Sequence, residues 1–507
     1  MAKRSTPPLW SVFAIDPASA TSRQDQIAEH IRKAVLAGHV RPGMRLPSTR
    51  SLAAELEVSR QTAVLAYEKL MAEGYVTGRI GSGLYVPDVL PEDLLLPLPA
   101  GRTAPAGPAG GNWTPRLSAR GLRLASLPIT PVRRSAGLLA PGIPALDRFP
   151  HDLWARLSTR FWKGRPGVDL LGYGGPSGFR PLREAIADHL GATRAIACTA
   201  DDIVITAGAQ NAIDLAARLL IDPGDEVMVE DPAYVAGRSA LEAAGGCVVP
   251  VPVDPDGLDV TAGEAMAPRA RLALVTPSHH YPLGVPMSLS RRLSLLDWAE
   301  RADGWILEDD CDGDYRYAGH PLRPLRALGR AAAARRVIYI GSFAKVLAPG
   351  LRLGFLVAPT GLAEAFGTAR GLIDRHSPIS TQAVLADFIG EGHFAAHLRR
   401  MRVLYAERRD RLIHALERHC GDVLDWGKSP EAGLHLTAKL HGNGGTKPDD
   451  VEIWERVSRE GLQTPPLSAH YACERRAQAG FILGFAATPA DRIDEAAARL
   501  GRAIRLP

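Results

Sequence analysis

Short runs of β-branched and aliphatic residues alternate with helical stretches in the middle of the chain. Seven such runs have the length and composition of buried strands. They cover residues 203–205, 226–229, 247–249, 272–275, 305–307, 337–340 and 355–357. Because strands that alternate with helices pair mostly in parallel, the sequence predicts an α/β domain with a largely parallel sheet.

Reactive and anion-binding side chains follow the strand at 337–340. Ser342, Lys345 and Arg352 come after it in order, and ligands of such sheets collect at the carboxyl ends of strands. The lysine can form an imine with an anionic aldehyde cofactor, while the serine and the arginine can bind a phosphate. The alternative is a lysine that is simply exposed, as most lysines are.

Other predicted strands also end in polar or flat side chains. Small residues after 203–205, among them Gly208 and Ala209, leave backbone N–H groups free for a phosphate, although a packing turn explains them equally well. Tyr234, after 226–229, can stack on a flat ring or pack in a core. After 305–307, four carboxylates in five residues indicate that one has a buried cationic partner, unless the turn is solvated.

No metal site or membrane segment is predicted. The adjacent His279 and His280 would point in opposite directions on a strand. Five scattered cysteines form no C-x-x-C pair, which fits a reducing cytoplasm. There is neither a readable signal peptide nor an apolar run of about 18 residues, so we expect a cytoplasmic protein. At 507 residues we expect two or three domains, and the net charge of +5 does not by itself indicate a nucleic-acid partner.

The N-terminal segment has the pattern of three helices and a hairpin. Helices are predicted at 24–37, from Ser48 or Thr49 to 56, and at 60–73, with Val64, Tyr67, Leu70 and Met71 facing inward on the third. Residues 75–86 alternate about a glycine-rich turn, as hairpins do. This order predicts a winged helix-turn-helix.

The residues expected at DNA fall into three groups. Ser59, Arg60, Gln61 and Thr62 begin the helix that would enter the major groove. Arg45, Ser48 and Arg50 lie where the preceding helix starts and can contact phosphates. The wing tip, which includes Ser82 and Gly83, can approach the DNA backbone. The alternative is a small helical domain with an ordinary charged surface.

Two resemblances cover most of the chain. The N-terminal segment contains the motif R-L-P-S-x-R-x-L-A-x-x-L-x-V-S-R-x-T, followed by A-Y, E-G-Y-V and G-S-G-x-Y-V. With these motifs, residues 23–86 resemble the GntR family of bacterial winged-helix repressors. From about residue 136 onward, the ordered motifs resemble the fold-type I pyridoxal 5'-phosphate (PLP) enzymes of the aspartate aminotransferase superfamily. Between them, residues 88–135 are rich in Pro, Gly and Ala and are predicted to form a linker without a sustained period.

The second resemblance implies roles for individual residues. Lys345 would form the Schiff base with PLP, Asp309 would pair with the pyridine nitrogen, and Tyr234 would stack on the ring. The implied phosphate ligands are Gly208, Ala209, Gln210, Ser342 and Arg352. Tyr173 matches a tyrosine that reaches the phosphate of the neighbouring subunit, which implies a homodimer.

The combination is similar to the MocR group of transcription regulators. We therefore expect a head at 17–87, the linker at 88–135 and a PLP-binding effector domain at 136–507. The implied function is a DNA-binding regulator that senses PLP or a small amine or amino acid. The alternatives are a working aminotransferase with a DNA-binding head, and a DNA-binding protein whose large domain is only a dimerisation scaffold.

The sequence departs from the aminotransferase pattern at two places. Cys311 replaces a tyrosine that would hydrogen bond to the phenolic oxygen of PLP; His280 or Tyr281 could supply that bond instead. Residues 481–489 lack the arginine that grips a substrate carboxylate, so that another cation, such as Arg375, Arg475 or Arg476, would be needed. Both departures favour sensing over turnover.

Overall fold

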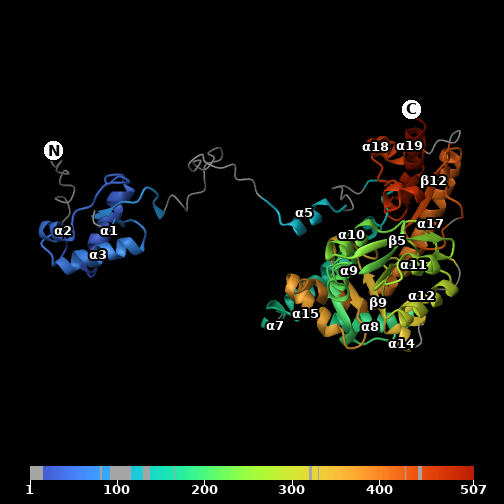
Figure 1. Ribbon diagram of the computed structural model, residues 1–507, viewed down its shortest axis with the longest axis horizontal. Coiled ribbons are helices and arrows are strands. Elements are labelled where there is room, and N and C mark those ends of the chain that lie inside the picture. Colours follow the sequence, from blue (N-terminus) through green and yellow to red (C-terminus); the bar gives the residue numbers. More distant parts are fainter. Residues whose placement is uncertain are drawn as a thin grey trace. The chain divides into compact units, whose positions relative to one another are not determined.

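The computed structural model describes residues 15–79, 83–91, 116–128, 137–165, 167–318, 322–328, 331–428, 430–442 and 448–506. Contacts divide the chain into two compact units, residues 1–115 and 116–507. The first contains a small helical head and the second a large α/β domain (Figure 1).

Three helices and a hairpin form the head. They are α1 (Arg23–Leu36), α2 (Thr49–Glu55), α3 (Arg60–Ala72), β1 (Thr77–Arg79) and β2 (Gly83–Tyr85). Ser48 and Ser59 cap the N-termini of α2 and α3, and each hydroxyl accepts a backbone N–H of the first turn at 3.1 Å. The two strands pair antiparallel, with Thr77 opposite Tyr85. The predicted winged helix-turn-helix is confirmed, although residues 80–82 of the wing tip, and with them Ser82, lie outside the described residues.

The inner face of α3 differs from the prediction at two positions. Met71 is 38% exposed and Val64 is only half-buried, whereas Ala63 and Ala66 are fully buried. The buried positions follow the i, i+4, i+7 period from Ala63. Ala63 and Ala66 share this buried face with Tyr67 and Leu70, in the cluster that also contains Ile27 and Ile31 of α1.

A sheet of eight strands organises the large domain. Its strands are β3 (Ile203–Thr206), β4 (Glu226–Asp231), β5 (Cys247–Asp254), β6 (Gly257–Leu258), β7 (Leu272–Val275), β8 (Trp305–Asp309), β9 (Val337–Ser342) and β10 (Gly354–Val357). They lie in the order β3-β10-β9-β8-β7-β4-β5-β6. The run β5-β4-β7-β8-β9 is parallel, and β10 is antiparallel to both of its neighbours. All seven predicted strands are therefore present, in a largely parallel sheet.

Helices cover both faces of this sheet, as Figure 1 shows. Ile338 and Ile340 of β9 belong to an apolar cluster with α9 (Ala209–Leu220), α10 (Val235–Ala244) and α15 (Ala363–Asp374). Val337 of the same strand packs in a cluster with α11 (Val260–Met266) and α12 (Leu289–Arg301), and Tyr339 packs in a third. Strands buried on both faces read as continuous apolar runs, which is why they were predictable.

The third cluster joins the sheet to the C-terminal part of the chain. It contains residues of α6 (His151–Lys163), α8 (Arg180–Arg194), α16 (Ile379–Gly390), α17 (His393–Cys420) and α19 (Ile493–Arg505). A second, antiparallel sheet follows the order β11-β12-β13, with β11 (Leu424–Asp425), β12 (His435–Leu440) and β13 (Gly480–Gly484). Short elements complete the domain: α5 (Ala119–Ser126), α7 (Val168–Leu171), α13 (Leu325–Leu328), α14 (Ala331–Ala334) and α18 (Asp450–Arg459).

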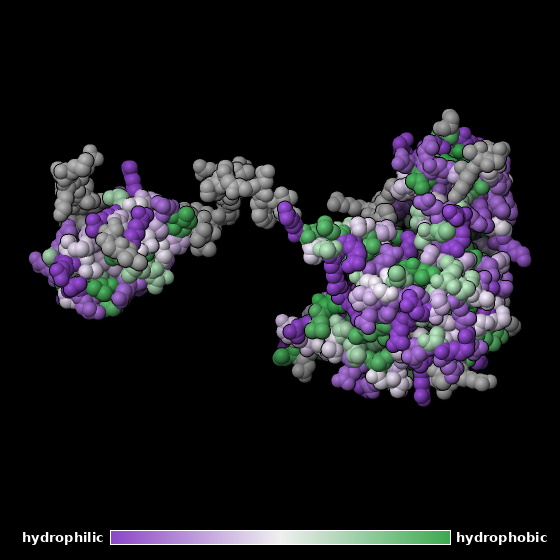
Figure 2. Space-filling model, in the orientation of Figure 1, coloured by the Kyte–Doolittle hydropathy of each residue, from purple (hydrophilic) through white to green (hydrophobic). Residues whose placement is uncertain are grey.

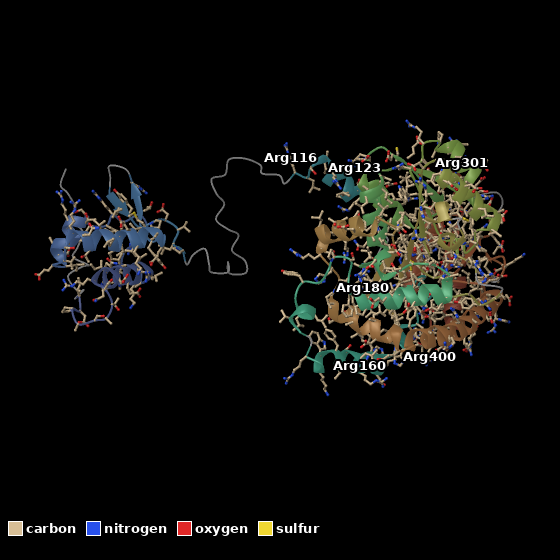
Figure 3. All side chains as sticks on the ribbon, turned by 90° about the horizontal axis from the view of Figure 1, so that it is seen from below. Arg116, Arg123, Arg160, Arg180, Arg301 and Arg400 are labelled. Atoms are coloured by element: carbon tan, nitrogen blue, oxygen red, sulfur yellow. The ribbon has the colours of Figure 1, made fainter. Side chains whose placement is uncertain are left out.

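The helix α5 lies within the stretch that the sequence predicted as a linker without a sustained period. Ser118 caps it through its hydroxyl, and none of its residues is buried. Arg123 lies on α5 and Arg116 lies just before it, as Figure 3 shows. In the described parts of the chain, no helix is both long and apolar enough to span a membrane.

Candidate ligand site and nucleic-acid interface

Lys345 lies just beyond the carboxyl end of β9, at the edge where the parallel strands end. Its half-buried side chain donates from Nζ to the carbonyl oxygen of Gly142 at 3.0 Å. The neighbouring strand β8 ends at Asp309, which is opposite Ile340 in the register. The sheet therefore brings the predicted imine lysine and the predicted partner of the pyridine nitrogen to the same edge.

Asp309 is a buried carboxylate with two close neighbours. The thiol of Cys311 donates to its Oδ1. Burial raises the pKa of Asp309 to about 6, although the thiol bond and the positive charge of Lys345 act in the opposite direction. Burial and the nearby carboxylate raise the pKa of the Cys311 thiol well above its usual range. Cys311 is thus a neutral donor to Asp309.

A candidate phosphate cradle lies where β3, α9 and β10 meet. Gly208 precedes α9 with a φ of +120°, and no side chain caps this helix. A Cβ on Gly208 would lie 3.9 Å from Nη1 of Arg352, and a Cβ on Gly354 would lie only 2.8 Å from Cα of Gly208. Glycine at both positions therefore allows the close approach that leaves the helix N-terminus and a guanidinium facing one point.

The remaining predicted phosphate ligands lie around the cradle. Ser342 is the last residue of β9, and its hydroxyl accepts the N–H of Ala344 at 3.2 Å. Ala209 and Gln210 form the first turn of α9. Nε2 of Gln210 donates to the carbonyl of Ala236 at 2.8 Å, while its Oε1 is buried without a partner.

Tyr234 immediately precedes α10 and lies close to the groups described above. Burial raises its pKa to about 12, reinforced by the charge of Asp309 and opposed by that of Arg352. Its ring meets Tyr281 edge to face, with the centroids 6.4 Å apart. Tyr234 thus feels the charges of both Asp309 and Arg352, and an aromatic ring close to these two groups can cover a flat, anionic ligand.

His280, which the sequence offers as a possible partner of the cofactor, is buried and has partners within the protein. Its Nδ1 accepts the N–H of Leu283 at 3.2 Å, and its Nε2 lies 3.5 Å from Oε2 of Glu230. Burial lowers its pKa to about 3, so the ring is neutral. Oη of Tyr281 pairs with Nε2 of His470 at 3.3 Å. Each ring therefore has a structural partner of its own, and a bond from either to the cofactor stays a prediction.

The carboxylates beside Asp309 have separate partners. Asp310 forms a buried ion pair with Arg194 and accepts from Oη of Tyr339 at 2.7 Å. Glu308 accepts the first N–H groups of α13. The buried cationic partner that the sequence indicated is thus Arg194, which lies 116 residues away in the chain.

A histidine-rich cluster lies next to this edge. Nδ1 of His279 is 3.0 Å from Oδ2 of Asp312, and the ligand atoms of these two residues and His435 lie within 4.8 Å of one another. Nε2 of His435 pairs with the carbonyl of Pro282 at 3.0 Å. One nitrogen of each ring is thus already hydrogen bonded, and we assign no metal to the cluster.

A cation missed by sequence reasoning lies on the first turn of α10. Arg238 is 9% exposed, its Nη1 is buried without a partner, and no side-chain hydrogen bond or ion pair of it is recorded among the described residues. By contrast, Arg375 stacks on the ring of Tyr173 and Arg476 pairs with Asp231. The available signal was sequence spacing: Arg238 follows Tyr234 by four residues, and its N–H donates to the carbonyl of Tyr234 at 3.1 Å in the first turn of α10.

The residues expected at DNA lie on the surface of the head. Arg45, Ser48, Arg50, Ser59, Arg60, Gln61 and Gly83 are exposed, and Thr62 is half-buried. No ion pair is recorded for Arg45, Arg50 or Arg60 within the described part of the head, so their charges are open to phosphates.

Four of these residues also have structural roles. The hydroxyls of Ser48 and Ser59 are the helix caps, and Thr62 shares the second cap through a 2.8 Å contact with Ser59. The guanidinium of Arg45 packs against Gly83, where a Cβ would lie 2.9 Å from Nε. Arg45, which precedes α2, therefore lies against the first residue of the wing strand β2.

Comparisons with known proteins match the head and the large domain to two different families. The model "Bacterial regulatory proteins, gntR family" matches residues 23–86, and the model "Aminotransferase class I and II" matches residues 165–500. Among solved structures, the kynurenine aminotransferase of Pyrococcus horikoshii is similar with a TM-score of 0.65 and 30% identity, over 73% of this chain and 91% of that one. The α-aminoadipate aminotransferase LysN of Thermus thermophilus is similar with a TM-score of 0.65 and 28% identity, over 72% of this chain and 91% of that one.

Regulators match over nearly the whole chain. The probable rhizopine catabolism regulatory protein MocR of Rhizobium meliloti is 38% identical, over 91% of this chain and 89% of its own length. The pyridoxine biosynthesis regulator PdxR of Corynebacterium glutamicum is 32% identical, over 97% and 98%. The chain therefore belongs to the MocR-type group of GntR-family transcriptional regulators, in which a winged helix-turn-helix head precedes an aminotransferase class I and II domain.

Proposed function

We propose that this regulator binds PLP at Lys345 and reports the occupancy of that site to promoter DNA. The observation that carries the proposal is the gathering of Lys345, Asp309, Gly208 and Arg352 at one sheet edge. A relative is named for the regulation of pyridoxine biosynthesis, and a similar structure was solved with a phosphopyridoxyl ligand. Our domain assignment is a head at 17–87, a linker at 88–135 and an effector domain at 136–507.

The residues present fit the cofactor. Gly208, with Arg352 beside it, would hold the phosphate, Asp309 would pair with the pyridinium, and Tyr234 would cover the ring. When bound, PLP supplies an aldehyde that captures amines. Lys345 would hold that aldehyde covalently, since its amine is the nucleophile at the site.

Borohydride trapping tests this assignment. Reduction of the protein with PLP should fix a phosphopyridoxyl group on the peptide that contains Lys345, as read by mass spectrometry. A label spread over exposed lysines with none at Lys345 would contradict the proposal.

Regulation is favoured over turnover by two features of the site. Cys311 donates to Asp309, so no tyrosine occupies that position to bond the phenolic oxygen. The strand β13 is apolar and buried throughout and offers no cation to a carboxylate. A site that captures a ligand without the groups that speed transfer suits a sensor.

The affinity for PLP should fall at acid pH. Asp309 has a pKa of about 6 in the free protein, and only its charged form pairs with the pyridinium. As the pH falls below about 6, binding must first displace a proton, so the dissociation constant should rise by up to about tenfold per pH unit. Titration between pH 5 and 8 measures this. In Asp309→Asn, the part of this pH dependence that comes from the carboxyl group should disappear. Equal pH dependences of the dissociation constant in the two proteins would contradict the assignment.

We propose that a carboxylate on an amine effector would be bound by Arg238. Nη1 of Arg238 is buried without a hydrogen-bond partner among the described residues, and such a group is costly unless an anion neutralises it. The loop that holds His470 packs on this turn, since the N–H of Ala233 donates to the carbonyl of His470 at 3.1 Å. Burial, reinforced by the charge of Arg238, lowers the pKa of His470 to about 4. Through His470 this corner is linked to Tyr281 and Tyr234.

Matched ligands test the role of Arg238. We expect 4-aminobutyrate to perturb the spectrum of bound PLP at a lower concentration than 1-aminobutane, by about tenfold or more, because a charge-assisted bond contributes about 1.5–3 kcal/mol. Arg238→Met should abolish this preference while the PLP band remains. No preference in the unaltered protein, or the same preference in Arg238→Met, would contradict the role.

We propose a homodimer joined through the α7 end of the large domain. Hydrophobic residues gather there, as Figure 2 shows in green. Val168 is 85% exposed, Leu171 61%, Tyr173 82% and Leu372 84%. Contiguous exposed apolar residues mark protein interfaces, and the tyrosine is the residue that matches a contributor to the neighbouring subunit's site.

Charged substitutions test this interface. Val168→Asp together with Leu372→Asp should shift the protein from dimer to monomer in sedimentation velocity, because burying two unpaired carboxylates is unfavourable. The control Val403→Asp changes a residue that is 74% exposed on α17 and should leave the dimer intact. A monomeric unaltered protein would contradict the proposal.

A further inference from the structure

The segment that leads from the linker into the large domain passes directly over Lys345. Residues 137–148 form this strap. The carbonyl of Leu139 accepts the N–H of Gly484 at 2.8 Å, and the N–H of Leu139 donates to Oγ1 of Thr488 at 2.8 Å. Further along, the N–H of Ala145 donates to Oη of Tyr405 at 2.9 Å. The strap is thus held at both ends, by β13 on one side and by α17 on the other.

Between these anchors, Gly142 is in contact with the lysine. Its carbonyl oxygen accepts from Nζ of Lys345 at 3.0 Å across 203 residues of sequence. Its φ is +70°, and a Cβ at this position would lie 2.2 Å from Nζ. Only glycine combines this backbone conformation with room for the amine. No other hydrogen bond of the Lys345 side chain is recorded among the described residues.

We propose that Gly142 is a positioning residue for Lys345, and that its bond to the amine is a latch that covalent capture of an aldehyde releases. This inference rests on the proposed function. When Nζ adds to the aldehyde carbon, the carbonyl oxygen leaves as water with the two hydrogens of the neutral amine. Held in a double bond to that carbon, Nζ would keep at most one proton, and a phenolic oxygen on the bound ligand would compete with the carbonyl of Gly142 for it. Lys345 would then no longer hold Gly142 as the free amine does.

The strap connects the Lys345 site to the linker, because residues 137–148 come just after the linker in the chain. Release of the latch therefore acts on the backbone next to the linker. The central part of the strap would lose its hydrogen bond to Lys345, while Leu139 and Ala145 keep theirs to the residues that anchor the strap. The same strap is the chain's path to the residues that precede it, which include the linker and the head. Occupancy of Lys345 is thereby converted into a change in backbone freedom at the start of the large domain.

Hydrogen exchange measures this change directly. Peptides that cover residues 137–148 should exchange at least about threefold faster after PLP is added to the cofactor-free full-length protein. In Lys345→Met, the strap should exchange equally with and without PLP. If the PLP absorbance band forms at Lys345 and the strap's exchange is unchanged or slower, the latch is wrong and the proposed function stands. If no band forms, the proposed function itself fails.

A pair of glycine variants tests the positioning role. Gly142→Ala should displace the amine of Lys345 and slow formation of the PLP band by about tenfold or more, since misplacing a reacting group is costly. Gly361→Ala introduces the same left-handed strain at a φ of +89° with no heavy atom within 4 Å of the new Cβ, and it should form the band at the original rate. Equal rates in the two variants would overturn the positioning role.

Discussion

Lys345→Ala should give a protein that folds, binds its operator and no longer forms the PLP absorbance band. The amine is the nucleophile at this edge, and its half-buried side chain carries no core packing that alanine would disrupt. Loss of the covalent bond should weaken PLP binding by at least about 100-fold, which corresponds to roughly 2.7 kcal/mol. Absorbance titration and melting temperature measure the two parts of this prediction.

The matched control is Lys439→Ala. Lys439 is an exposed lysine on β12 of the same domain, and it should contribute only adventitious imines. The control should keep the band and the affinity of the unaltered protein. If the band survived in Lys345→Ala and disappeared in Lys439→Ala, the assignment of the site would be wrong.

Arg60→Ala should weaken operator binding by about 1–3 kcal/mol, which is roughly 5- to 150-fold. Arg60 is the first residue of α3, it is exposed, and no ion pair holds it within the described part of the head. A phosphate contact would lower the slope of log K against log salt by about one and weaken all sequences alike, whereas a base contact would relax specificity at one position. Fluorescence anisotropy at several salt concentrations separates these two outcomes.

Lys69→Ala is the control on the same helix. Lys69 lies near the C-terminal end of α3, where Nζ pairs with Oδ1 of Asp25 at 2.6 Å. Since its charge is already paired and lies away from the N-terminus of the helix, operator affinity should change little. An equal loss in both variants would indicate general electrostatic attraction rather than insertion of the α3 N-terminus into a groove.

Much of the fold could be predicted because the signals are local. The strands are short apolar runs, and the helices of the head begin at serines whose hydroxyls accept the first N–H groups. That Asp309 and Lys345 lie at one edge could also be predicted, because each follows a predicted strand and parallel strands place their carboxyl ends at the same edge of a sheet.

Contacts between distant parts of the chain were not predictable from one sequence. Gly142 lies 203 residues from Lys345, and nothing in its own surroundings indicates an acceptor for an amine. Arg194 could not be matched to Asp310, since any of several arginines would satisfy the pattern. Helical spacing predicts Met71 on the inner face of α3, whereas Met71 is 38% exposed and Ala63 and Ala66 are buried instead. In each case the contact or the burial depends on packing between distant parts of the chain, which the local sequence pattern does not specify.

Operator affinity with and without PLP, compared in the unaltered protein and in Lys345→Ala, tests the central claim most directly. PLP should change the operator affinity of the unaltered protein by about fivefold or more, in line with a coupling free energy of at least 1 kcal/mol, and should leave that of Lys345→Ala unchanged. An operator affinity that does not respond to PLP in the unaltered protein, or that responds equally in both proteins, would contradict the account.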